Sequence, residues 1–206
     1  MPENNALARQ FTLPSLMRFA LPNIIMMVFL SMYTIVDGMF ISRYVGTLAL
    51  SAVNMTYPLN CLEMALGIML ASGGSAIIAR QLGEGKEDKA RHNFSFLITV
   101  SVAVSLVFLL AAIFFLDPII SALGASEAQF DLCRTYARIL LLFSPAFFLQ
   151  TAFQTLFITA GRPGLGLAAT VGGGLTNIVL DYVFIARLHW GIAGAAIATG
   201  LGYLVP

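Results

Sequence analysis

The stretch FSFLITVSVAVSLVFLLAAIFFL, residues 94–116, decides the fold class of this chain. None of its residues is charged. The hydrocarbon core of a bilayer is about 30 Å thick and requires about 20 predominantly apolar residues in a helix. The stretch meets this length, and it ends at Asp117-Pro118, where a charge and a helix-breaking residue follow each other. It therefore predicts a transmembrane helix.

The composition of the whole chain agrees with a membrane protein. Of 206 residues, 59% are hydrophobic and 10% are charged, whereas a soluble domain has about 25% charged residues. The net charge is +1 and there is no long basic run, so the positive surface that nucleic acid requires is absent and we exclude nucleic acid as a partner. Cys61 and Cys133 match no metal-ligand spacing and are interpreted as packing residues.

Six apolar segments follow one another along the chain, with charges, glycines and prolines at their boundaries. We expect membrane spans at residues 15–42, 49–79, 93–116, 134–160, 165–187 and 191 to the end. The fold class predicted is an all-α polytopic membrane protein, with residues 1–206 forming one six-helix transmembrane bundle. The last segment runs only from Gly191 to Pro206, so we expect the sixth helix to be cut short.

Basic residues predict the orientation, because Lys and Arg are retained on the cytoplasmic side of a membrane. One side, formed by the N-terminal segment and the connections after the second and fourth spans, carries Arg9, Arg18, Arg80, Lys86, Lys89, Arg91 and Arg162. The other side carries Arg43, Arg134, Arg138 and Arg187. The excess predicts a cytoplasmic N-terminus. Residues 80–93 are expected to form a cytoplasmic loop or a short surface helix, and Trp190 and Tyr203 are interpreted as anchors at the membrane interface.

Three carboxylates lie inside the expected spans: Asp37, Glu63 and Asp181. An ionisable residue within a span costs at least about 2.5–3.5 kcal/mol on insertion scales, so it usually faces a cavity or a partner and marks a functional path. Residues four apart share one face of a helix. Tyr33 therefore points with Asp37, and Asn177 points with Asp181.

A third helix offers a similar polar face, since Ala195 and Thr199 are also four apart and the small alanine leaves its backbone carbonyl approachable. Carboxylate, amide, hydroxyl and carbonyl oxygens suit a hard cation such as Na⁺. Two carboxylates that lie close together in a low dielectric could instead share a proton. The alternative is that Asp37 and Asp181 are unrelated, each satisfied locally by a polar neighbour or a water. The spacing alone leaves these interpretations open.

Glu63 and Pro22 each admit two interpretations. Glu63 either lines the central cavity, where it would attract cationic solutes, or pairs with an arginine such as Arg138. Pro22 removes a backbone hydrogen bond inside the first span and predicts a helix bend. That bend is either a hinge or a static kink.

The sequence shows no recognisable catalytic machinery. The glycine-rich stretch that begins at Gly164 follows no predicted strand, so it is not a dinucleotide fingerprint. GEGKE, residues 83–87, lacks the upstream glycine and the following Ser or Thr of a phosphate-binding loop. No membrane-embedded histidine accompanies a serine for nucleophilic chemistry. We therefore expect a non-enzyme without a bound cofactor.

Several segments, taken in order, resemble the N-terminal half of the multidrug and toxic compound extrusion (MATE) family. They are RFALPNII, YTIVDGMFISRYVG, GGSAIIARQLGEGKEDKA, TAGRP, TNIVLDYVFI and GIAGAAIATGLGY. The resemblance covers nearly the whole chain. It implies a cation-coupled antiporter with twelve spans in two six-helix lobes, of which this chain holds the first and lacks the second.

The resemblance also implies roles for individual residues. The family's cation site in this lobe falls on Asp37, Asn177, Asp181, Ala195 and Thr199, of which the two aspartates, Asn177 and Thr199 are the side-chain candidates for holding Na⁺. Tyr33 would line the same cavity, Pro22 would be the bend in the first helix, and Gln154 falls where the family often has a polar amide. Leu30 is apolar where some members have a polar side chain, and Glu63 matches no family motif.

The expected function is therefore export of organic, cationic or amphipathic compounds across the bacterial inner membrane, driven by entry of Na⁺ or H⁺. Two other classes stay open. A flippase for lipid-linked saccharides, from the same wider superfamily, would need several basic residues facing inward, whereas here the membrane acids outnumber the clear membrane bases. A non-transporting membrane scaffold, or a half-size unit that dimerises, is the other alternative.

Overall fold

The computed structural model describes residues 13–205, with the side chains of residues 13–16, 18, 19, 22 and 23 excepted. The chain is all helical over this range, which confirms the predicted fold class. Its elements follow in the order α1 (Leu13–Phe40), η2 (Ile41–Val45), α2 (Thr47–Gly83), α3 (Glu87–Phe114), α4 (Leu116–Ala122), α5 (Glu127–Leu142), α6 (Ser144–Thr159), α7 (Pro163–Asp181), η3 (Tyr182–Arg187) and α8 (Gly191–Gly202).

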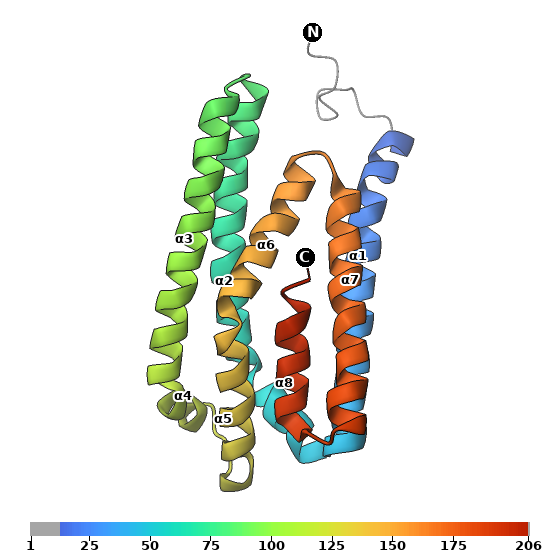
Figure 1. Cartoon of the computed structure of the whole chain (residues 1–206), viewed down its shortest axis with the longest axis vertical. Coiled ribbons are helices and arrows are strands. Elements are labelled where there is room, and N and C mark those ends of the chain that lie inside the picture. Colours follow the sequence, from blue (N-terminus) through green and yellow to red (C-terminus); the bar gives the residue numbers. More distant parts are fainter. Residues whose placement is uncertain (1–12, 206) are drawn as a thin grey trace.

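The helices run up and down along one long axis (Figure 1). The α2–α3 and α6–α7 connections and the start of α1 lie at the upper end of the view, while α4, the start of α5 and the start of α8 lie at the lower end. The connections thus alternate between two sides, as expected for helices that cross a membrane in succession. Helices α1 and α7 pack on each other, α2 packs on both α3 and α6, and α8 packs on α5 and α7.

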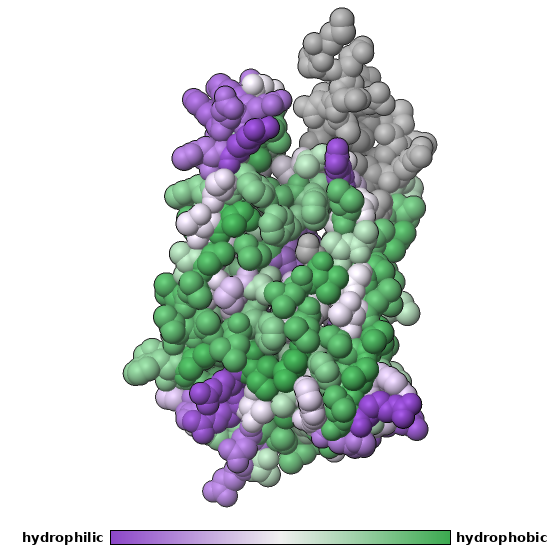
Figure 2. Space-filling model, in the orientation of Figure 1, coloured by the Kyte–Doolittle hydropathy of each residue, from purple (hydrophilic) through white to green (hydrophobic). Residues whose placement is uncertain are grey.

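The distribution of hydrophobic residues on the surface is typical of a membrane protein. Figure 2 shows a broad hydrophobic band around the middle of this face and polar residues concentrated at the two ends. Within the described residues, four helical segments are long and apolar enough to cross a membrane, and α5 with α6 makes a fifth if the pair is one span. The α8 helix is a shorter apolar helix that reaches about the middle of the bundle in Figure 1.

The expected fourth span, residues 134–160, is wrong as a single helix. It is split at Phe143 into α5 and α6, which are bent by 55° relative to each other. Pro145 lies in the first turn of α6, where its missing N–H would have no intrahelical partner in any case. The proline thus starts a new helix, and α5 begins well before residue 134 with a capping box formed by Ser126 and Gln129.

The predicted loop or surface helix over residues 80–93 is also not a separate element. Helix α2 continues to Gly83 and α3 starts at Glu87, so only a tight turn with Gly85 at φ +71° separates them. Its 37 residues make α2 about 55 Å long at about 1.5 Å per residue. Both helices therefore extend beyond the bilayer as a polar hairpin.

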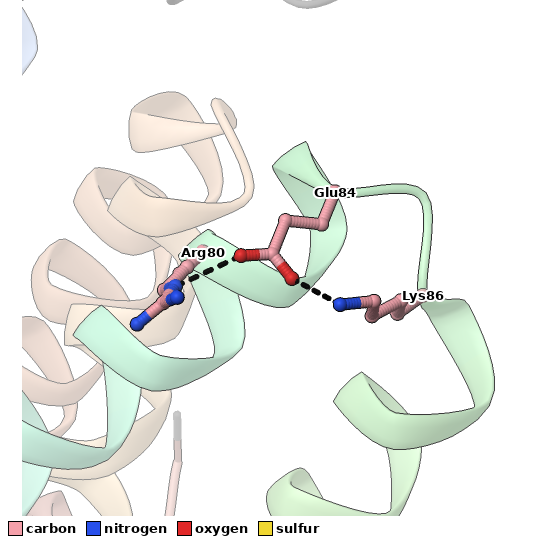
Figure 3. Close-up of polar contacts among 3 residues, drawn as sticks. All are labelled: Arg80, Glu84 and Lys86. Atoms are coloured by element: carbon pink, nitrogen blue, oxygen red, sulfur yellow. Dashed lines mark hydrogen bonds and ion pairs between the residues drawn. The ribbon is translucent and has the colours of Figure 1, made fainter.

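Glu84 joins the two sides of this hairpin turn (Figure 3). Its carboxylate accepts hydrogen bonds from Lys86 Nζ at 2.6 Å and from Arg80 Nε at 2.9 Å. These two cations lower the pKa of Glu84 below its ordinary value. The group is exposed, and surface ion pairs contribute little to stability, so the contacts set the geometry of the turn more than its free energy.

Close packing of α8 against the break between α5 and α6 predicts a large effect at Gly200. A Cβ at this position would overlap the Phe143 ring, so Gly200→Ala is expected to destabilise the chain by about 1–3 kcal/mol through overpacking. Gly73→Ala is the matched control, because no atom lies within 4 Å of its Cβ position and Ala favours a helix. Thermal unfolding in detergent measures both; equal behaviour of the two variants would contradict this packing.

Candidate cation site between α1, α7 and α8

The structure brings Asp37 and Asp181 together from opposite ends of the chain. Asp37 lies in the last turn of α1, and Asp181 is the last residue of α7. Their carboxyl groups lie within hydrogen-bonding reach of each other. Asp181 is fully buried. The spatial pairing of the two acids, which the sequence spacing left open, is therefore a feature of the fold.

The oxygens of this pair lack partners. Among the described residues, Asp37 Oδ1 and both Asp181 oxygens are buried without a hydrogen bond. An ionised carboxylate only accepts hydrogen bonds, so two of them side by side have no donor to share. Buried polar atoms normally have a partner. A proton or a small cation between the two groups would supply what the protein atoms do not.

Each acid stands next to a π-helical segment. The η2 segment starts at Ile41, just beyond Asp37, and η3 starts at Tyr182, directly after Asp181. The two segments pack against each other. Short π-helical turns within longer helices occur frequently at functional sites. Here they directly follow the last turns of α1 and α7, which carry the acid pair.

Asn177 and Thr199 extend the site toward α8. Asn177 precedes Asp181 by four residues and is 2% exposed. Its Nδ2 donates to Thr199 Oγ1 at 3.3 Å, and its Oδ1 is buried without a partner among the described residues. The Thr199 hydroxyl donates to the Ala195 carbonyl at 3.0 Å. The Ala195 oxygen is therefore partly used, although a carbonyl keeps a second lone pair.

A small cavity adjoins these residues. It offers about 20 Å³ to the centres of water-sized spheres, enough for about one water, which needs about 10–15 Å³. An organic compound does not fit. The lining residues are Leu30, Tyr33, Gln150, Thr170, Gly173, Gly174, Asn177, Thr199, Gly202 and Tyr203. Tyr33, predicted to line the cavity, is among them, and it lies near both Asp37 and Asp181.

Two cavity residues were missed by sequence reasoning. Tyr203, interpreted as an interfacial anchor, instead lines the cavity with its ring edge against Phe147, the centroids 5.2 Å apart. Gln150 lines the cavity one turn before Gln154, and Gln154 Nε2 donates to Thr170 at 2.9 Å. The four-residue spacings from Thr199 to Tyr203 and from Gln150 to Gln154 were the available signals.

The other predicted site residues lie apart from this cavity. Glu63 is buried on α2 beside the Ser144 hydroxyl, while the Arg138 side chain is exposed and no ion pair between the two is found in residues 13–205. Pro22 lies within α1, but its side chain is outside the described residues, so the helix bend stays a prediction.

The donor set at the acid pair is all oxygen. Within residues 13–205, no three His, Cys, Asp or Glu side chains are grouped so as to hold a metal ion. Two carboxylates, an amide oxygen, a hydroxyl and a backbone carbonyl suit a hard cation or a proton better than a transition metal. The arrangement can therefore bind and release a small positive ion.

Known proteins resemble this chain in sequence and in fold. The MatE family profile matches residues 22–183. The multidrug export protein MepA of Staphylococcus aureus (strain MRSA252) is 29% identical over 190 residues, covering 91% of this chain and 42% of MepA. MepA of Staphylococcus haemolyticus (strain JCSC1435) is 28% identical over 187 residues, covering 91% of this chain and 41% of that protein. The chain thus spans about two fifths of the length of the curated relatives it matches.

Solved structures give the same result. An outward-facing multidrug resistance MATE family transporter of the MOP superfamily superposes with a TM-score of 0.86 at 28% identity, covering 91% of this chain and 42% of that one. A MOP superfamily transporter from Pyrococcus furiosus Vc1 (DSM3638), described as having a binding pocket of reverse polarity that suggests a different function, also superposes with a TM-score of 0.86 at 28% identity, covering 91% and 41% of the two chains.

Proposed function

This chain belongs to the MatE family of multidrug transporters, and we propose that it forms the N-terminal lobe of an antiporter that couples entry of Na⁺ or H⁺ to export of organic compounds. The proposal includes a second lobe of similar size, because the curated relatives are more than twice as long as the part matched here. It also includes the bacterial inner membrane, with the N-terminus in the cytoplasm.

The observation that carries the proposal is the partnerless pair Asp37 and Asp181. Leaving the two carboxylates side by side without a counterion or a proton is costly in a low-dielectric surrounding. Entry of one positive charge removes that cost. Asn177 lies one helical turn before Asp181 on α7 and is hydrogen-bonded to Thr199, and its Oδ1 has no partner among the described residues, so these two residues can complete the coordination of Na⁺ or orient a proton.

Cation binding can be coupled to a change in helix arrangement because the site joins several helices. The candidate ligands lie on α1, α7 and α8, so a bound cation draws three helices together, and its loss lets the two acids repel. A cation that binds one arrangement of these helices more tightly than another shifts the equilibrium between them. Cargo affinity changes by the same coupling free energy, which in such systems amounts to about 1–3 kcal/mol.

Buried charge favours a cationic or amphipathic cargo over a lipid-linked saccharide. Every Arg and Lys side chain that the structure describes is exposed, whereas Glu63 and Asp181 are buried. A flippase for an anionic lipid-linked substrate would require basic residues facing the interior. The acidic interior instead complements positively charged solutes and their coupling ions.

The cation site can be tested on the chain as it is. We expect NaCl to stabilise the purified chain against thermal unfolding relative to choline chloride at equal ionic strength, by about 2.7 kcal/mol at 100 times the dissociation constant. If H⁺ is the coupling ion, potentiometric titration is expected to show protons bound by wild type that the Asp37→Asn/Asp181→Asn variant does not bind.

The matched control replaces one aspartate that lies outside the site. Asp131 is exposed on α5, so Asp131→Asn is expected to keep the full Na⁺ response. Equal Na⁺ binding and equal proton binding by wild type and the double variant would refute a coupling site at Asp37 and Asp181.

A further inference from the structure

We propose that Glu63, with Ser144, forms a second proton-binding site in this lobe, located where α2 meets the break between α5 and α6. This site is separate from Asp37 and Asp181 and does not depend on the proposed coupling mechanism. Its ligand is a proton exchanged with water.

The burial of Glu63 leaves its carboxylate without compensation. Its side chain is 7% exposed and that of Ser144 is 0% exposed. The Glu63 carboxyl lies beside the Ser144 hydroxyl, yet neither Glu63 Oε1 nor Ser144 Oγ has a well-formed hydrogen bond to any described residue. A buried ionised carboxylate that is neither paired nor hydrogen-bonded carries a large free-energy cost. A proton on Glu63 removes the charge and supplies the missing donor.

Among the residues that the structure describes, no positive group faces Glu63 from the elements packed on α2; Arg43 of η2 is exposed. Helix α3 has no charged residue from Phe94 to Phe114, and α6 has none at all. On α5 the buried titratable side chains are Cys133 and Tyr136, while Arg134 and Arg138 are exposed. From α8, Tyr203 lies near Glu63 and also near Asp37.

Arg134 also forms an ion pair with Asp117, with its Nε 3.0 Å from Asp117 Oδ1. Within the described residues, the surroundings of Glu63 therefore contain the hydroxyls of Ser144 and Tyr203 but no cation that would keep it ionised. The proton is the ligand that the burial of Glu63 and the lack of a hydrogen-bond donor at its Oε1 favour.

Protonation of Glu63 would affect a region where several helices are tightly packed. One turn beyond Glu63, a Cβ at Gly67 would lie 3.6 Å from the Phe147 ring of α6. Phe147 packs edge-on against Tyr203 of α8, and Gly200 of α8 meets Phe143 at the helix break. Glu63 therefore stands at the point where α2, α6 and α8 converge.

The exchange itself is simple. Glu63 takes a proton from water and donates the resulting O–H to Ser144 Oγ. When the proton returns to water, the carboxylate accepts a hydrogen bond from the Ser144 hydroxyl and carries a full negative charge. The charged form favours opening of the break between α5 and α6, because opening admits water to the carboxylate.

Infrared difference spectroscopy tests this site on the purified chain in nanodiscs. All spectra are recorded in the Asp37→Asn/Asp181→Asn background, so that a protonated acid of the cation site cannot contribute and failure of the proposed function does not affect the result. We expect a carbonyl band of a protonated carboxylic acid at neutral pH, reduced at least tenfold by adding Glu63→Gln.

Three further variants make the test decisive. Ser144→Ala keeps the carboxyl group and is expected to shift the band frequency, because the acid loses its hydrogen-bond acceptor, while Ser144→Thr is expected to restore the frequency. Glu84→Gln, an exposed acid in the hairpin turn, should leave the spectrum unchanged. Absence of the band at neutral pH, its persistence after Glu63→Gln, or its indifference to Ser144→Ala would overturn the proposal.

Discussion

Asp181→Asn is expected to abolish export by a two-lobe protein in which residues 1–206 replace the corresponding part of the Staphylococcus aureus relative. Asn keeps the size of Asp but carries no negative charge and cannot take up a proton. Asp181 is fully buried, and both of its oxygens lack partners in the described part of the chain, so nothing else compensates for the lost charge. Efflux of a fluorescent organic cation from cells lacking other exporters measures the effect, with an expected fall of about 100-fold, within the range of known coupling energies.

The appropriate control for this loss is another neutralised aspartate. Asp131→Asn changes the same functional group at an exposed position on α5 and is expected to leave efflux unchanged. Both variants must reach the membrane in wild-type amounts, which immunoblotting checks. Efflux by Asp181→Asn at the control rate would remove Asp181 from the mechanism.

The chain alone is expected to produce no efflux, whereas the same chain joined to a second lobe exports the dye. A cargo path between lobes needs two walls, and one six-helix bundle supplies only one. The side of the bundle formed by α1 exposes large apolar side chains, among them Met27, Met32, Ile35 and Met39, which a second lobe or lipid must cover. Dye efflux from cells that express each form measures the difference.

This comparison also separates the antiporter from its alternatives. Export by residues 1–206 alone would contradict the two-lobe proposal and favour a half-size unit that dimerises. Specific cation binding by the lone chain without any efflux agrees with a lobe that contains the ion site but not the complete cargo path. If no form of the protein shows efflux or specific cation binding, the scaffold alternative remains.

The sequence predicted the helices better than the way they break. Long uncharged runs such as residues 94–116 determine spans directly, because each must fill the bilayer core. The α5–α6 break was missed because Pro145 is compatible both with a bend inside one helix and with the first turn of a new one. The structure distinguishes the two, because α5 ends at Leu142, α6 starts at Ser144 and the two helices are bent by 55°.

The candidate site was predicted in part. Helical spacing placed Tyr33 with Asp37 and Asn177 with Asp181, but spacing within a helix says nothing about which helices meet, and the resemblance supplied that step. The structure brings the two acids together and links Asn177 to Thr199. Tyr203 was misassigned because an aromatic residue near the end of an apolar run is typical of the interface, although here it faces inward.

The π-helical segments were beyond sequence reasoning altogether. The η2 and η3 segments pack on each other in the fold, and hydrophobic periodicity does not reveal the wider turn of a π-helix. Glu63 is the opposite case: its position in an apolar span marked it as unusual, but its neighbour Ser144 lies on a different helix and became visible only in the fold.

The central claim is that Asp37 and Asp181 act as one cation site, and a double-mutant cycle on cation binding tests it most directly. Na⁺ stabilisation and proton binding are measured for wild type, Asp37→Asn, Asp181→Asn and the double variant. If the acids share one ion, each single variant loses the whole response and the double variant loses no more, because contacting residues are not additive. Independent, additive losses from the two substitutions would contradict the claim.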